Sequence, residues 1–165
     1  MPPCATCPPV IRRTRGFTLV ELVVVVVVLG VLAAFAVPRF LSLEREARVA
    51  AVESLAGALR STAYQVRALC MTTPGCPTGS ASWQGTLGGR QYWLNYGWPD
   101  AGDELNGRQV DALVEYAGFR ASIVGNPSVR FVRDDAPDPL RCSVQYFDAW
   151  HTPPTMRVVT VTDGC

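Results

Sequence analysis

One apolar run constrains this chain more than any other feature. It extends from Phe17 to Val37, is 21 residues long and contains one ionisable side chain, that of Glu21. A helix of this length spans about 30 Å, which is the thickness of the hydrocarbon core of a bilayer. The six consecutive valines at 23–28 favour strands in water, but a segment in lipid must satisfy its own backbone hydrogen bonds. The run therefore predicts one membrane-spanning helix.

The remaining composition excludes several classes of protein. A chain of 165 residues allows one folded domain and an appendage. All 15 cationic side chains are Arg, so neither a Schiff-base lysine nor a phosphate-loop lysine is available. The net charge of +1 argues against a nucleic-acid partner held by a broadly basic surface. His151 is the one histidine, and it has no recognisable nucleophile or metal motif around it, so we expect neither an enzyme nor a cofactor or metal.

The orientation of the apolar run depends on the residues around it. Three Arg lie on each side, so the positive-inside count does not decide: Arg12, Arg13 and Arg15 precede the run, and Arg39, Arg45 and Arg48 follow it. An even number of cysteines, which suits an oxidising compartment, lies beyond the run: Cys70, Cys76, Cys142 and Cys165. We therefore expect a cytoplasmic N-terminus and an extracytoplasmic domain.

Two interpretations of the N-terminal segment compete. A secretory signal peptide could be cut after Ala34-Phe35-Ala36, but its apolar region is normally 7–15 residues long. The run here is longer, and Glu21 would lie inside it. The second interpretation is a cut between Gly16 and Phe17, which removes residues 1–16 and retains the helix.

Residues 15–22, Arg-Gly-Phe-Thr-Leu-Val-Glu-Leu, support the second interpretation. They resemble the prepilin motif of type IV pilins and type II secretion pseudopilins. The resemblance implies that a membrane prepilin peptidase removes residues 1–16 after Gly16 and then methylates the new amine of Phe17. It also implies other pilin subunits, an inner-membrane assembly machinery and the lipid bilayer as partners, with no nucleic acid.

Glu21, Gly30 and Pro38 match further positions of that family. The resemblance implies that Glu21 pairs with the Phe17 amine of a neighbouring subunit, and that Gly30 loosens and Pro38 kinks a helix over 17–38. The alternative for Glu21 is a pair within one chain, since Phe17 and Glu21 are four residues apart on one helical face. The alternative for Gly30 and Pro38 is that the helix merely tolerates them, as membrane helices often do.

Three further segments resemble the MSHA-type (mannose-sensitive haemagglutinin) pilins: residues 29–48, residues 95–99 and residues 153–165. This resemblance implies a structural subunit that is held in the inner membrane as a precursor and assembled into an extracellular adhesive filament. Two alternatives stay open, a type II secretion pseudopilin and a membrane-anchored binding domain that never assembles.

Apolar spacing after the run predicts an amphipathic continuation of the helix over 39–69 and a globular head over 70–165. The expected buried stripe comprises Leu43, Ala47, Ala51, Leu55, Leu59, Ala63, Val66 and Leu69. Residues 71–89 are predicted to be a loop and 103–116 a helix. Strands are predicted at 90–96, 120–125, 128–133, 142–147 and 155–162. The expected fold is α+β, with the long helix packed on an antiparallel sheet of about four strands.

Four cysteines allow three disulfide connectivities, and the sequence does not choose among them. Sequence proximity and the pilin resemblance favour Cys70–Cys76 and Cys142–Cys165, the second of which would close the C-terminus. The spacings fit zinc sites poorly. Cys4 and Cys7 form an isolated C-x-x-C in the leader, which we attribute to chance or to a start codon placed too far upstream.

Two surface features complete the hypotheses. Asp134, Asp135 and Asp138 form an acidic segment, which we interpret as a solvated turn; the alternative is a calcium loop like that of pseudopilins. The four tryptophans could belong to the core or bind glycans, and the core is expected for most of them: Trp83, Trp93, Trp98 and Trp150.

Overall fold

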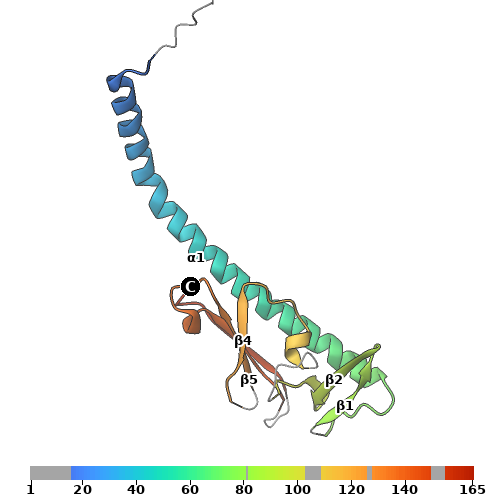
Figure 1. Ribbon diagram of the computed structural model, residues 1–165. Coiled ribbons are helices and arrows are strands. Elements are labelled where there is room, and N and C mark those ends of the chain that lie inside the picture. The colour runs from blue at the N-terminus through green and yellow to red at the C-terminus, as the bar shows by residue number, and fades with distance from the viewer. Residues whose placement is uncertain (1–15, 81, 103–108, 126–127, 150–154) are drawn as a thin grey trace, which may run out of the picture. The chain divides into compact units, whose positions relative to one another are not determined.

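The computed structural model describes residues 16–80, 82–102, 109–125, 128–149 and 155–165. The chain divides into two compact units, Met1–Leu41 and Ser42–Cys165, which are described separately. Helix α1 (Leu19–Thr72) begins in the first unit and continues into the second (Figure 1). Of the residues discussed above, Cys4, Cys7, Arg12, Arg13, Arg15, Trp150 and His151 lie outside the described part of the chain.

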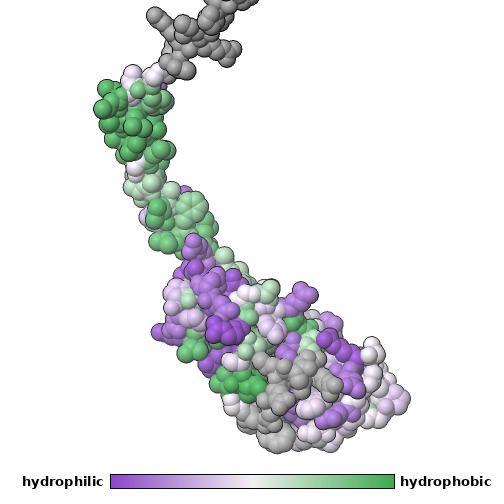
Figure 2. All heavy atoms as spheres, viewed as in Figure 1, coloured by the Kyte–Doolittle hydropathy of each residue, from purple (hydrophilic) through white to green (hydrophobic). Residues whose placement is uncertain are grey.

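The described part of the first unit is mainly an apolar stretch of α1. Nearly every residue from Leu19 to Leu41 is exposed, and Figure 2 shows hydrophobic residues covering this part of the helix. By length and composition, α1 could cross a membrane. Pro38 lies within the continuous helix, and the predicted kink at this residue stays a prediction.

The larger of two antiparallel sheets lies in the second unit. Its strands occur in the order β4 (Phe119–Ile123), β5 (Ser128–Arg133), β6 (Ser143–Phe147) and β7 (Arg157–Val161). The predicted α+β class and four-stranded antiparallel sheet are therefore confirmed. Short 3₁₀ turns, η1 (Val110–Ala112) and η2 (Pro139–Arg141), precede β4 and β6 respectively.

The smaller sheet contains β1 (Trp83–Leu87), β2 (Arg90–Asn95) and β3 (Trp98–Pro99) in that order. Strand β1 lies within the segment predicted to be a loop, so that prediction is wrong for these five residues. Gly85 obscured the alternating pattern because glycine disfavours strands. In the structure a Cβ at Gly85 would clash with the Trp83 ring, so the missing side chain makes room for the indole.

The prediction of a helix at 103–116 is also wrong for the residues of this segment that the structure describes. Residues 103–108 lie outside the described part of the chain, and 109–116 contain only the single turn η1. Val110 is fully buried and Leu113 packs against the core. A helix this short is marginal by itself, so the tertiary contacts of its apolar side chains decide the conformation.

The core shows where the predicted helical stripe was correct. Leu55, Leu59, Ala63 and Val66 are buried, but Leu43 and Leu69 are exposed. Each four-residue step overshoots a full helical turn by about 40°, so a stripe spaced mostly by four drifts around the helix. The remaining buried positions of α1 keep closer to the true period: Val52, Ala56 and Cys70.

Polar contacts join the two sheets. Asn95, at the end of β2, is 5% exposed, and its Nδ2 donates to Asp148 Oδ2 at 2.8 Å and to Asp100 Oδ1 at 3.0 Å. Asp148 directly follows β6, so this amide connects the small sheet to the large one. Tyr146 is fully buried and donates to the carbonyl of Pro99 at 2.7 Å, and its burial raises its pKa well above the ordinary value.

Two disulfides close the second unit. Cys70–Cys76 joins the last turn of α1 to the segment after it, with the two Cα atoms 5.3 Å apart. Cys142–Cys165 joins the start of β6 to the segment after β7, with the two Cα atoms 4.8 Å apart. These are the pairs that the pilin resemblance implies.

Candidate functional site

The candidate site is the start of α1, where the residues of the prepilin-like motif lie. Thr18 is the N-cap: its Oγ1 accepts the backbone N–H of Glu21 at 3.2 Å, and its carbonyl accepts the N–H of Leu22 at 3.2 Å. Thr18 and Glu21 therefore have the T-x-x-E spacing of a capping box. The role of Thr18 was not predicted from the sequence, although this spacing before an apolar run is a recognised signal of a helix start.

The cap places the expected cleavage site outside the helix. Gly16 and Phe17 precede Thr18 in non-helical backbone, and the Phe17 side chain is 70% exposed. Phe17 and Leu22 occupy the two positions, before the cap and in the second turn, at which a hydrophobic staple forms. The same short segment thus provides an exposed Gly16–Phe17 peptide bond and a defined helix start two residues later.

Glu21 lies on an exposed surface in the first turn of α1. Its carboxylate forms no hydrogen bond or ion pair with any residue that the structure describes, while its backbone N–H is satisfied by Thr18. A carboxylate near a helix N-terminus is favoured by the helix dipole, but in lipid it costs a few kcal/mol and normally acquires a partner. The side chain is thus available to a partner outside the described chain.

Gly30 and Pro38 lie further along the same helix. A Cβ added at Gly30 would meet nothing within 4 Å, so no packing within this chain requires glycine there. Gly30 and Pro38 both disfavour helix, Gly by about 1 kcal/mol relative to Ala. Both residues are exposed in the described part of the helix, and their roles in loosening or bending it stay predictions.

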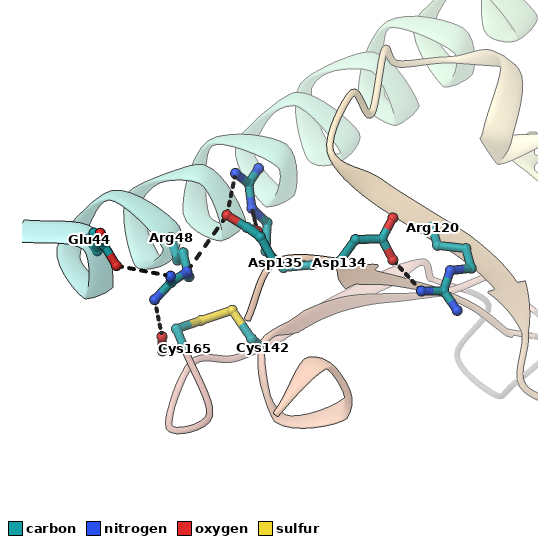
Figure 3. A network of polar contacts seen from close by, with 8 residues as sticks. Glu44, Arg48, Arg120, Asp134, Asp135, Cys142 and Cys165 are labelled. Carbon is teal, nitrogen blue, oxygen red and sulfur yellow. Dashed lines mark hydrogen bonds and ion pairs between the residues drawn. A yellow bond between two sulfur atoms is a disulfide. The ribbon is translucent and has the colours of Figure 1, made fainter. Parts of the chain in front are cut away.

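A second polar centre connects α1 to the head (Figure 3). Arg48 pairs with Glu44 at 3.3 Å and with Asp135 at 3.7 Å, and it donates to the main-chain oxygen of Cys165 at 3.2 Å. Twelve residues further along α1, Arg60 donates to the Val158 carbonyl of strand β7 at 3.1 Å. These two arginines hold the helix to the last strand and to the disulfide-linked segment after it.

The acidic segment is paired with arginines. Asp134 lies 2.5 Å from Arg120, and Asp135 lies 2.5 Å from Arg133 as well as near Arg48. Within the described ranges, no group of three metal-ligating side chains gathers. A calcium ion at this turn would have to displace guanidinium groups from the carboxylate oxygens that it needs.

Asp135 gives the head an acid-sensitive contact. The hydrogen bond from Arg133 is the largest cause that lowers the pKa of Asp135 below its usual range. A carboxyl with a lowered folded-state pKa stabilises the fold above its unfolded pKa, and the contribution is lost as the pH falls through the folded value.

We therefore expect Asp135→Asn to lower the melting temperature slightly at pH 7 and to have no effect at a pH well below about 4. The effect is small because the Asp135 side chain is 56% exposed and solvent screens the pair. Thermal unfolding of both proteins across this pH range measures it. Asp138→Asn is the control, since Asp138 is an exposed carboxylate of the same segment. A difference between wild type and Asp135→Asn that persists unchanged at low pH would contradict the assignment.

Comparison with known proteins places the N-terminal segment in a class. Residues 11–37 match the prokaryotic N-terminal methylation motif. The helix, the antiparallel sheets and the Cys142–Cys165 disulfide together match the α+β pilin fold. The chain is thus an α+β protein whose long N-terminal helix carries this motif.

A relative of known role matches part of the chain. Over 54 residues the chain is 50% identical to the type IV narrow pilus major component PilA5 of Thermus thermophilus. The match covers 33% of this chain and 46% of that protein, so it spans less than half of the relative. No solved structure matches the chain. The MSHA subtype is not supported by these similarities.

Proposed function

We propose that this chain is a structural subunit of a type IV pilus, held in the inner membrane as a precursor and assembled into an extracellular filament. The observation that carries the proposal is the exposed apolar stretch of α1, which begins at Leu19, two residues after the non-helical Gly16–Phe17 bond, inside a methylation motif. An apolar surface of this length needs lipid or other apolar surfaces around it. A filament of packed helices provides such surroundings outside the membrane.

Cleavage would create a partner for Glu21, whose carboxylate has none among the described residues. Hydrolysis after Gly16 releases a positive amine at Phe17, and N-methylation leaves it charged. At about 4 Å and an effective dielectric constant near 20, the bare attraction between this amine and a carboxylate is about 4 kcal/mol. Desolvation offsets much of that, so the pair would mainly fix the register between neighbouring subunits.

The remaining features support details of the same proposal. Local unwinding between Gly30 and Pro38 would let packed helices lengthen under load. The resemblance of residues 29–48 and 95–99 supports an MSHA-like, adhesive subtype. The cysteines after the helix support an inner-membrane precursor with a cytoplasmic N-terminus. The prepilin peptidase, the assembly machinery and other subunits are the partners that this role requires.

The alternatives predict different molecules. A type II secretion pseudopilin would share the processed N-terminus and depend on calcium rather than on disulfides. The disulfide beside the Arg-paired acidic turn favours the pilin. A membrane-anchored binding domain would keep residues 1–16 and would never assemble.

The mature N-terminus tests the proposal most directly. We expect the intact mass and N-terminal sequence of protein from cells with a prepilin peptidase to show an N-methylated Phe17. The reason is that the exposed, non-helical bond before the Thr18 cap suits proteolysis. A chain that begins at Val37 would indicate a secreted domain, and an uncleaved leader would indicate a simple anchor. Either result would contradict the pilin proposal. Inactivation of the peptidase in the same cells is the control.

A further inference from the structure

We propose that the outward face of the β1–β2 hairpin is a binding site for a neutral carbohydrate. Trp93 of β2 lies directly opposite Gln84 of β1, and Gln91 lies one pleat further along the same face. These side chains border a cavity of about 260 Å³, which is also lined by Gly85 and Tyr92. The site is separate from the processing segment and from the Arg48 network.

The other face of the hairpin packs against helix α1 and contributes to the hydrophobic core. Alternation along the strands places Trp83, Leu87, Tyr92 and Leu94 on that face, where they pack with Val66 and Cys70 of α1. Trp93 belongs to neither hydrophobic cluster, although it is partly shielded from solvent. A large apolar ring that contributes to no core is a candidate for contact with a ligand.

The hairpin holds this indole in a defined position. The carbonyl of Trp93 accepts the N–H of Asp100 at 2.9 Å, and the next residue on the same face, Asn95, is buried and hydrogen-bonded. Gln84 and Gln91 are exposed beside it. On this face of β2, the Trp93 ring therefore lies between the buried, hydrogen-bonded Asn95 and the exposed amide of Gln91.

The chemistry of the lining favours a sugar. A flat indole offers an apolar surface for the C–H face of a pyranose ring, and each glutamine amide both donates and accepts hydrogen bonds, as sugar hydroxyls do. None of the five lining residues is charged at neutral pH, and Arg90, the nearest cation in β2, lies on the opposite face. A charged ligand would therefore find no counter-charge among these five lining residues.

The test uses the full chain in a zwitterionic detergent without sugar groups, with nitrogen-15 in its tryptophans. Each indole then gives one N–H resonance, and Trp93→Phe identifies the signal of Trp93. Mannotetraose and cellotetraose are the neutral probes, and tetragalacturonate is the anionic control. We expect one neutral probe to shift the Trp93 signal selectively and saturably, with a dissociation constant of about 1 mM, and the anionic probe to leave it unchanged.

Substitutions on this face distinguish a specific sugar-binding site from nonspecific contact with the surface. We expect Gln84→Ala and Gln91→Ala each to weaken binding by roughly fivefold, because each loses an amide that pairs with hydroxyls. Thr86→Ala should bind as wild type does, since Thr86 is exposed on the same face but outside the cavity lining. The melting temperature of each variant verifies its fold.

Three results would overturn the proposal: no shift with either neutral probe, equal shifts of all four indoles, or unchanged binding by both glutamine variants. The assay measures single chains in micelles, so its outcome does not depend on whether the chain forms filaments.

Discussion

Replacement of Glu21 by Ala is expected to abolish or severely impair filament formation while membrane insertion remains normal. The carboxylate is exposed in the first turn of α1 and has no partner among the described residues. In lipid a lone charge costs a few kcal/mol, so removing it should if anything ease insertion. Assembly, in contrast, would lose the attraction that aligns each incoming subunit with the amine of its neighbour.

Electron microscopy of surface filaments and fractionation of the membrane precursor measure the two outcomes separately. Glu53→Ala is a matched control, because Glu53 is an exposed carboxylate of the same helix. Glu21→Gln separates charge from helix capping, since the amide can still occupy the third position of a capping box. We expect Glu21→Gln to assemble poorly as well. Normal filaments with either Glu21 variant would remove the ion pair from the mechanism.

Removal of the Cys142–Cys165 disulfide, by Cys142→Ser together with Cys165→Ser, is expected to destabilise the head by about 3.5 kcal/mol. The bridge closes a loop across a sequence separation of 23 residues, so its loss restores considerable freedom to the unfolded chain. The substitution also frees the segment whose main-chain oxygen accepts from Arg48. Thermal unfolding should show a fall in melting temperature of roughly 10 °C.

The paired replacement of Cys70 and Cys76 is the internal comparison. Its loop is shorter, with a sequence separation of 6 residues, and the same loop-entropy argument gives about 2.3 kcal/mol. Denaturant unfolding of both variants under non-reducing conditions ranks them. A larger loss from the Cys70 and Cys76 pair would show that local strain, rather than loop length, governs the contribution of these bridges.

The parts of the fold that the sequence predicts well are those set by local patterns. The apolar run and strand β5, at Ser128–Arg133, follow directly from residue spacing. Strand β1 was missed because Gly85 is required by the Trp83 ring, which is a packing fact that periodicity does not contain. The helix predicted at 103–116 failed within 109–116 because burial of Val110 outweighs its helical spacing.

In the candidate site, too, the features set by local sequence could be predicted and those set by tertiary contacts could not. Gly16, Phe17 and Glu21 are recognisable because the motif is local, and the Thr18 cap could have been recognised from the same short segment. The Arg48 contacts could not, since the partner at Cys165 lies 117 residues away in the sequence. Likewise, only the strand register shows that Gln84 faces Trp93 while Trp83 faces the core.

The attachment of β7 has a mechanical consequence. This strand is an edge of its sheet, and an edge strand is ordinarily the easiest to peel away, one hydrogen bond at a time. Here Arg60 donates to the Val158 carbonyl near the start of the strand, and the disulfide from Cys165 to Cys142 anchors the segment after its end to the start of β6. Under tension on the head, the Arg60 contact or the disulfide would therefore have to break before β7 could separate from β6 from either end.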